Sequence, residues 1–377
     1  MAFLFRNKKW FIVILAIIAV VLLLSGKDKN NVVSNDTETS KYKSEPSQQL
    51  VKNVPKPRGN RLLGMGITEG GVGFDEAFAL AQGAGVKVVE LPTPWDDSEP
   101  EARQYVEGWL PIANQFYPKA GIKLAITLNP IDTNNLRLPK DLKNKSFNDP
   151  EIIERYEAFV DFAAKQLPDS DVFFVAIGNE IDAYLGSSDK RWQEYTEFFA
   201  AVAPYVREKF PNVVIGSKIT YDGVVNLNDK VRRLNNYADA VLTTYYPFKQ
   251  GEFIVRDPGT VHEDFKRIVD LYPDKKIYFA EIGYPSGSLN GSSETKQADF
   301  IKEAFAAWDS YTDKIPFLNF VWLHDVSPEA VVNYQKYYDS EDKGFASFFG
   351  TLGLRTYDGK DKQAFVTLGE EVKKRGW

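Results

Sequence analysis

The chain alternates short apolar runs with amphipathic segments from residue 61 to residue 374. Eight runs have the length and apolar content of buried β-strands, and they span residues 61–68, 86–91, 122–129, 172–180, 213–220, 238–246, 276–281 and 317–324. Helical periodicity marks eight further segments, residues 74–84, 101–117, 151–167, 191–210, 230–237, 261–271, 295–310 and 363–374. The third of these follows Asp149-Pro150-Glu151, a typical helix start with Asp as N-cap and Pro at the first helical position.

This regular alternation predicts a (β/α)8 TIM barrel within the α/β class. The barrel would occupy residues 59–377, which suits the roughly 250 residues of that fold plus insertions. An open doubly wound sheet is the main alternative. It is less favoured because Gly64-Met65-Gly66 lies inside the first strand and Glu69-Gly70-Gly71 lacks the spacing of a phosphate-binding loop. A long final loop, residues 325–360, could fold over the barrel mouth.

The N-terminal segment has the pattern of a membrane signal. Arg6, Lys8 and Lys9 precede an uncharged apolar run over residues 10–26, near the lower limit of what spans a bilayer. Residues 1–26 are therefore expected to be an uncleaved single-pass anchor, with a cleaved signal peptide as the alternative. Residues 27–58 are polar and predict a disordered linker. The catalytic part would then lie outside the cell membrane, or be secreted after cleavage.

Composition narrows the chemistry. The formal charge of −6 gives no indication of a nucleic-acid partner. The chain has no cysteine, which excludes disulfides, thiolate metal sites and a cysteine nucleophile. Its two histidines are too few for the usual histidine-rich hydrolytic metal centres. We therefore expect no catalytic metal and no cofactor. A structural calcium at Asp339, Glu341 and Asp342 in the final loop is the alternative to a solvated acidic turn there.

Two strand ends carry the most informative residues. The apolar runs before Glu180 and Glu281 are the predicted fourth and seventh strands. In a closed barrel all strand C-termini open on one face, where active sites are found, and strands four and seven lie across that face from each other. Two carboxylates presented in this way are the groups that cleave a glycosidic bond. For either glutamate alone, a salt-bridged strand end would be an equally good interpretation.

Three motifs resemble known glycoside hydrolases. Gly178-Asn179-Glu180-Ile181 and Ala280-Glu281-Ile282-Gly283-Tyr284-Pro285 resemble the strand-four and strand-seven ends of the retaining hydrolases of clan A. Together with Tyr245-Tyr246-Pro247-Phe248 they resemble the family 53 endo-β-1,4-galactanases, and Glu281 to Ser286 also resembles a family 17 β-1,3-glucanase motif. The second strand departs from both families, because it ends in Glu90-Leu91-Pro92 and lacks the arginine that many clan members carry there.

The resemblance implies catalytic roles for the motif residues. Glu180 would be the general acid/base, kept protonated by burial and by its negative partner. Glu281 would be the nucleophile of a two-step retaining mechanism. Asn179 would donate to the sugar 2-hydroxyl, although a strand-end cap is its alternative role. Tyr245 or Tyr246 would donate to the nucleophile. Only one of the two can point into the mouth, and Tyr246 is the preferred one.

Further residues at the same face are candidate sugar-binding groups. Trp322 and His324 share parity on the eighth strand, so Trp322 could form the floor of the −1 subsite with His324 as a polar wall. A core position is the alternative for Trp322. Trp95, Asn129 and Tyr284 are the remaining substrate-binding candidates, and Tyr284 could instead pack its loop.

The sequence thus predicts a retaining O-glycoside hydrolase that acts on an extracellular β-linked polysaccharide or oligosaccharide. We expect a monomer bound to the membrane only through its N-terminal helix. Two alternatives stay open. One is a catalytically inactive carbohydrate-binding barrel. The other is a lysine-dependent aldolase or lyase that would use Lys218, which has inward parity on the fifth strand.

Overall fold

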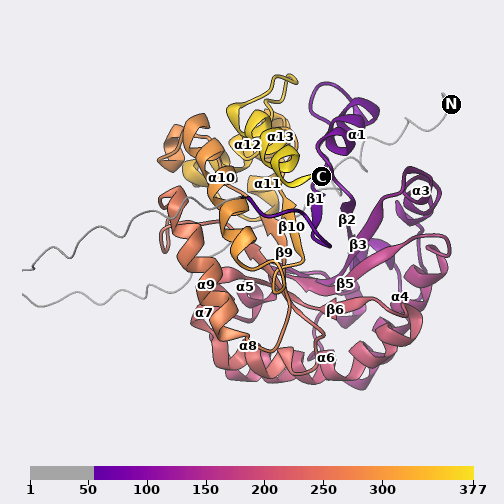
Figure 1. Cartoon of the computed structure of the whole chain (residues 1–377). Coiled ribbons are helices and arrows are strands. Elements are labelled where there is room, and N and C mark those ends of the chain that lie inside the picture. Colours follow the sequence, from indigo (N-terminus) through magenta and orange to yellow (C-terminus); the bar gives the residue numbers. More distant parts are fainter. Residues whose placement is uncertain (1–54) are drawn as a thin grey trace, which may run out of the picture.

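The computed structural model describes residues 55–377, and these form a parallel sheet that curls into a nearly closed barrel with helices around it (Figure 1). The strands follow the order β6-β5-β3-β2-β1-β10-β9-β8-β7, and β4 adds an antiparallel hairpin to β3. Their bounds are β1 Leu62–Met65, β2 Val88–Pro94, β3 Lys123–Asp132, β4 Asn135–Leu136, β5 Val172–Asn179, β6 Val214–Gly216, β7 Lys218–Thr220, β8 Val241–Tyr245, β9 Ile277–Ile282 and β10 Phe317–Phe320.

The arrangement is consistent with the predicted (β/α)8 barrel. Strands β6 and β7, at the two ends of the sheet path, are separated only by Ser217 and together form the fifth predicted strand. The first and last barrel strands, β1 and β10, pair in parallel. Eight predicted strands therefore account for the barrel, with one of them divided in two.

Helices cover the outside of the strands (Figure 1). Their bounds are α1 Phe74–Gly83, α2 Trp95–Ser98, α3 Leu110–Phe116, α4 Pro150–Lys165, α5 Ile181–Leu185, α6 Asp189–Lys209, α7 Tyr221–Asn226, α8 Asn228–Asn235, α9 Val261–Leu271, α10 Glu294–Ser310, α11 Pro328–Tyr337, α12 Lys343–Thr351 and α13 Gln363–Arg375. The predicted start of α4 is confirmed, because the Asp149 side chain accepts a hydrogen bond from the Glu151 amide at 2.9 Å.

Several predicted elements were wrong in extent. The second helix begins at Leu110 instead of residue 101, because Arg103 and Gly108 adopt left-handed backbone conformations that a helix cannot contain. Strand β2 continues through Pro94, and β10 ends at Phe320. Residues 325–360, predicted as a loop, contain the helices α11 and α12.

The anchor predicted for residues 1–26 and most of the polar linker lie outside the described residues. Among residues 55–377, no helix combines the length and the apolar character needed to cross a membrane.

Side chains alternate between the barrel interior and the layer beneath the helices. In β5, Phe174 and Ala176 belong to the interior cluster, whereas Val175 and Ile177 pack in the cluster shared with the helices. This period of two is what a strand imposes. The alternation ends at Gly178, whose backbone is left-handed (φ 80°) and which faces Tyr195 of α6. The direction of Glu180, the first residue after β5, is therefore set by the shape of the strand end and not by parity.

Strand β9 breaks this alternation by one residue. In the ladder with β8, Thr243 pairs with Phe279 and the next residue, Thr244, pairs with Glu281. Strand β9 therefore contains one extra residue here, Ala280, relative to β8. Its pairing with β10 shifts in the same stretch. Such a bulge re-aims the side chains that follow it. Ala280 lies in the interior cluster, and the next residue, Glu281, also reaches the interior, where its carboxylate contacts Lys218.

Candidate active site

Glu180 lies where β5 ends and α5 begins, at the C-terminal mouth of the barrel. Its backbone is left-handed (φ 44°, ψ 45°), an uncommon conformation for a non-glycine residue that is often found at functional sites. Its carboxyl group is fully buried. Oε1 accepts a hydrogen bond from the Thr244 hydroxyl at 2.6 Å, and Oε2 accepts one from the Thr133 hydroxyl at 3.0 Å.

Glu281 is also fully buried, but it has a cationic partner. Its Oε1 lies 2.6 Å from the Lys218 ammonium of β7, and its Oε2 accepts a hydrogen bond from the Tyr246 hydroxyl at 3.0 Å. Both contacts favour the ionised carboxylate. The preferred tyrosine of the Tyr245-Tyr246 pair therefore lies at the nucleophile candidate.

The fold brings the two glutamates into the same neighbourhood. Thr244, which donates to Glu180, is the register partner of Glu281 across the β8–β9 ladder. Burial, and next the negative charge of Glu281, raise the pKa of Glu180 well above its ordinary value. Glu180 is therefore suited to remain protonated near neutral pH, which is the condition a general acid must meet.

The charge state of Glu281 is set by opposing effects. Burial is the larger one and raises the pKa of Glu281 to about 8, while the charge and hydrogen bond of Lys218 and the hydrogen bond of Tyr246 act to lower it. Burial acts to lower the pKa of Lys218, but its two carboxylate partners outweigh burial and raise that pKa. Because Lys218 contacts Glu281 and not Glu180, Glu281 is the carboxyl that ionises more readily.

Asn179, the last residue of β5, is held by a neighbouring carboxylate. Its Nδ2 donates to Asp132 Oδ1 at 3.0 Å, while its Oδ1 has no hydrogen-bond partner among residues 55–377. The other oxygen of Asp132 accepts a hydrogen bond from the Tyr337 hydroxyl at 2.6 Å. A chain of hydrogen bonds thus links α11 to the residue before Glu180.

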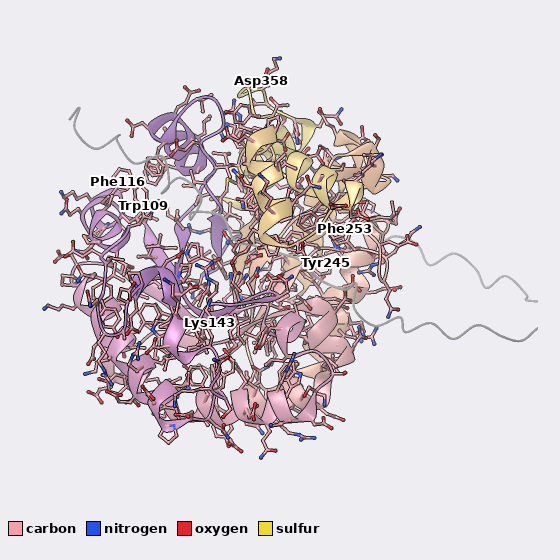
Figure 2. All side chains as sticks on the ribbon, turned by 180° about the vertical axis from the view of Figure 1, so that it is seen from behind. Trp109, Phe116, Lys143, Tyr245, Phe253 and Asp358 are labelled. Atoms are coloured by element: carbon pink, nitrogen blue, oxygen red, sulfur yellow. The ribbon has the colours of Figure 1, made fainter. Side chains whose placement is uncertain are left out.

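The mouth is covered by residues 325–360, which we call the cover segment. It contains α11 and α12, whose aromatic side chains pack into one cluster with Trp322. Tyr246 stands edge-on to Phe348 of α12 at 5.4 Å between ring centroids. Phe253, labelled in Figure 2, packs against the same helix through Phe345. The cover segment thus packs against Tyr246, whose hydroxyl donates to Glu281.

Polar contacts fix the cover segment to the β3–β4 hairpin. The side-chain amides of Asn134 and Asn135 donate to the carbonyl oxygens of Tyr338 and Tyr337 at 3.4 and 3.3 Å. The Tyr337 hydroxyl also accepts a hydrogen bond from Arg137 Nη1 at 2.8 Å. The Tyr337 ring therefore connects the cover to both Asp132 and Arg137.

Tyr337→Phe should loosen this attachment. The change removes the donor to Asp132 and the acceptor of Arg137 while keeping the ring, and it leaves a buried carboxylate oxygen without its donor. A cost of about 1–3 kcal/mol in unfolding free energy is expected. Amide hydrogen exchange in α11 should also become faster. Tyr357→Phe is the matched control, since Tyr357 is 42% exposed. Unchanged exchange in α11 would contradict the anchoring role of Tyr337.

Two further predicted residues lie buried with unpaired polar atoms. Neither atom of the Asn129 side-chain amide has a hydrogen-bond partner among the described residues, although Asn129 is fully buried in β3. Trp322 is buried against Tyr334 and Phe349 of the cover segment, and its Nε1 is likewise unpaired there. Buried polar groups normally have partners, so both remain candidates for contact with sugar hydroxyls.

The remaining predicted residues have partners elsewhere. Tyr245 is labelled in Figure 2, and its hydroxyl donates to Asp264 Oδ2 at 2.6 Å and not to Glu281. His324 lies beyond the end of β10, and its Nδ1 is 2.8 Å from the Thr68 carbonyl oxygen. The strand-eight parity argument fails because the strand stops at Phe320. The Tyr245 hydroxyl is thus occupied within the scaffold, whereas His324 Nε2 is buried without a hydrogen-bond partner among the described residues.

Trp95 and Tyr284 also pack within the scaffold. Trp95 is fully buried in α2, donates to Glu99 at 2.8 Å and packs between aromatic rings of α4. The Tyr284 hydroxyl donates to the Arg256 carbonyl oxygen at 2.7 Å, and its ring stacks on Phe300. Neither contacts the two glutamates.

Sequence reasoning missed several polar residues of the mouth, namely Glu90, Asp132, Thr133, Thr244 and Tyr337. A usable signal was present for some of them. A carboxylate or hydroxyl inside an otherwise apolar strand needs a buried partner, and Glu90 and Thr244 stand in such runs.

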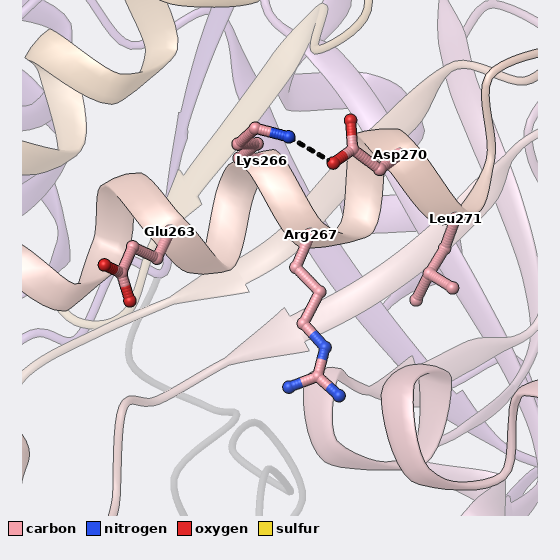
Figure 3. Close-up of a pocket in the computed structure, with 5 residues that line it drawn as sticks. All are labelled: Glu263, Lys266, Arg267, Asp270 and Leu271. Carbon is pink, nitrogen blue, oxygen red and sulfur yellow. Dashed lines mark hydrogen bonds and ion pairs between the residues drawn. The ribbon is translucent and has the colours of Figure 1, made fainter.

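A cavity outside the barrel lies away from the two glutamates. The cavity, of about 290 Å³, is lined by Glu263, Lys266, Arg267, Asp270 and Leu271, all on α9 at the outside of the barrel (Figure 3). Lys266 and Asp270 pair with each other there. In the part of the chain that the structure describes, no group of three or more histidine, aspartate or glutamate residues is placed to hold a metal ion.

The barrel resembles solved glycoside hydrolase structures. The GH5_18 protein from Streptomyces cattleya, solved with GlcNAc, aligns with a TM-score of 0.65 at 15% identity, over 85% of this chain and 81% of that one. The Ignisphaera aggregans GH53 catalytic domain aligns with a TM-score of 0.58 at 21% identity, over 86% and 97%. This chain has their fold. The likeness agrees with the clan A and family 53 resemblance of the sequence motifs.

The exo-β-1,4-mannosidase Op5Man5 from Opitutaceae bacterium strain TAV5 also aligns, with a TM-score of 0.64 at 15% identity, over 87% of this chain. The chain spans 62% of the length of that structure. No protein-family model matches the sequence, and no curated protein sequence does.

Proposed function

We propose that this protein is a retaining β-glycosidase with Glu180 as general acid/base and Glu281 as nucleophile. One observation carries the proposal. Two fully buried carboxyl groups stand at one barrel mouth in different environments, one bonded to two hydroxyls and one paired with an ammonium. Environments that push the pKa values of two carboxyls apart are the usual way to assign an acid and a nucleophile. The fold shared with GH5 and GH53 structures supports the same reading.

The reaction would proceed in two balanced steps. The Glu281 carboxylate attacks the anomeric carbon while Glu180 gives its proton to the leaving oxygen, so that the glycosidic C–O bond breaks and a glycosyl ester forms. Ester formation removes the negative charge of Glu281, and Glu180 then ionises more easily. In the second step Glu180 takes a proton from water, the water oxygen attacks the anomeric carbon, and the Glu281 carboxylate is released.

The substrate we propose is an extracellular β-linked polysaccharide or oligosaccharide. The cover segment over the mouth favours an enzyme that takes chain ends or short oligosaccharides, because an endo-acting enzyme needs an open cleft. The N-terminal apolar run of the sequence supports a location at the outer face of the cell membrane.

The test is hydrolysis by the full chain of a polymer and oligosaccharide panel that includes β-1,4-galactan, β-1,3-glucan, mannan, xylan and chitosan. The Glu180→Gln/Glu281→Gln double variant is the blank. Cleavage by the wild type alone, with release of sugars in the β configuration by proton NMR, supports the proposal. Binding without cleavage by both proteins would instead favour a carbohydrate-binding barrel.

The lysine-dependent alternative has less support. A Schiff base forms only from a neutral amine. Lys218 is instead held as a cation between Glu281 and Glu90, and this pairing raises its pKa. Borohydride trapping of a carbonyl substrate on Lys218 would contradict this reading.

A further inference from the structure

Lys218 bridges two carboxylates in the barrel interior. Its ammonium lies 2.6 Å from Glu281 Oε1 and 2.5 Å from Glu90 Oε1, and its side chain is 1% exposed. The three residues come from β7, β9 and β2, so the bridge crosses the barrel interior. One buried cation is therefore shared by two buried anions.

Glu90 is fixed independently of Lys218. Its Oε1 also accepts a hydrogen bond from the Thr127 hydroxyl at 2.6 Å. Its Oε2 lies 3.5 Å from the side-chain amide of Asn319, which donates to the Ala280 carbonyl oxygen at 2.8 Å. Ala280 is the residue immediately before Glu281, so the support of Glu90 and that of the nucleophile strand are connected.

We propose that Lys218 is a positioning residue for Glu281, and that Glu90 holds the Lys218 ammonium in place and takes a share of its charge. This inference rests on the proposed function, since it concerns how the nucleophile is kept ready. Glu90 then acts on Glu281 through Lys218 and makes no contact with the sugar.

The charges around Glu281 predict how each substitution changes its pKa. The groups that act on Glu281 are Lys218 from β7, Glu90 from β2, Tyr246 after β8 and Glu180 after β5. Lys218 and Tyr246 stabilise its carboxylate, whereas the negative charge of Glu90 acts to raise its pKa. Removing the cation should therefore raise the pKa of Glu281, and removing the Glu90 charge should lower it.

The experiment compares the pH dependence of kcat/KM for the full-length wild type, Lys218→Met, Lys218→Arg and Glu90→Gln. The acid limb reports the free-enzyme nucleophile. The apparent pKa of this limb should rise by about one unit or more in Lys218→Met. It should fall by about one unit in Glu90→Gln, since a nearby charge shifts a pKa by 1–3 units. Lys218→Arg should restore most of the wild-type limb. Lys123→Met is the control, because Lys123 pairs with Asp171 at an exposed site.

Shifts in the same direction, or no shift, would show that the bridge is only structural and would overturn the inference. If Lys218→Met does not fold, Glu90→Gln still tests the sign, because glutamine keeps the shape of the glutamate. A ¹³C NMR titration of the Glu281 carboxyl, assigned with Glu281→Gln, separates the two proposals. A protein that cleaves no sugar could still show a raised Glu281 pKa in Lys218→Met and a lowered one in Glu90→Gln. That result would support the bridge and reject the proposed function. An unchanged Glu281 pKa in both variants would reject the bridge.

Discussion

Replacing Glu281 with glutamine is expected to lower kcat by roughly 10⁴-fold or more, the scale seen when a nucleophile is removed. The amide keeps the shape of the side chain but cannot form the glycosyl ester. The fold should survive, because Lys218 retains Glu90 as a partner at 2.5 Å and Tyr246 can still donate to the amide oxygen. The measurement is kcat on an aryl β-glycoside, with circular dichroism and the thermal midpoint recorded alongside.

Glu303→Gln is the matched control for this change. Glu303 lies on the outer helix α10, where it pairs with His262 and its side chain is 43% exposed. Its replacement should leave kcat within twofold of wild type, an order-of-magnitude allowance for a surface position. If Glu281→Gln retained wild-type turnover, Glu281 would not be the nucleophile and the proposed mechanism would fall.

The barrel and the convergence of the two glutamates could be predicted from sequence because both follow from simple periodicity. Buried parallel strands appear as continuous apolar runs, and amphipathic helices such as α9, Val261–Leu271, match their predicted bounds. Once strands four and seven are counted, barrel geometry alone places Glu180 and Glu281 on one face.

The direction of Glu281 could not be predicted in this way. Strict alternation from the interior residue Ala280 would turn Glu281 toward the helices. The extra residue in β9 changes this, and a bulge depends on how β8 and β10 pair with β9. Sequence parity failed for His324 for a related reason, since β10 ends at Phe320, four residues before it.

Helices α11 and α12 of the cover segment were missed, although their start signals were present in the sequence. Ser327-Pro328 offers an N-cap followed by proline, and Asp342 caps α12 through the Phe345 amide at 2.9 Å. Their contacts could not be read from the sequence. The link from Tyr337 to Asp132 spans 205 positions and the link from Asp132 to Asn179 spans 47. Only the folded chain brings these residues together.

Glu180→Ala should separate the two chemical steps. On natural substrates, loss of the general acid is expected to lower kcat by about 10²–10⁴-fold. An aryl glycoside with a good leaving group needs no proton from Glu180, so formation of the glycosyl ester should continue in the variant. Hydrolysis of that ester should become slow, because the base that activates water is missing. Added azide is already an anion and needs no base, so it should attack the ester and restore turnover.

The configuration of the azide product decides between mechanisms. Two successive inversions at the anomeric carbon would give a β-glycosyl azide from Glu180→Ala. Glu281→Ala provides the matched comparison, because azide would then replace the missing nucleophile and a single inversion would give the α-azide. The two products are distinguished by the anomeric coupling in proton NMR. An α-azide from Glu180→Ala would contradict the retaining mechanism, and a β-azide from Glu281→Ala would exchange the roles of the two glutamates. Because Lys218 contacts Glu281 and not Glu180, we expect the roles to stand as assigned.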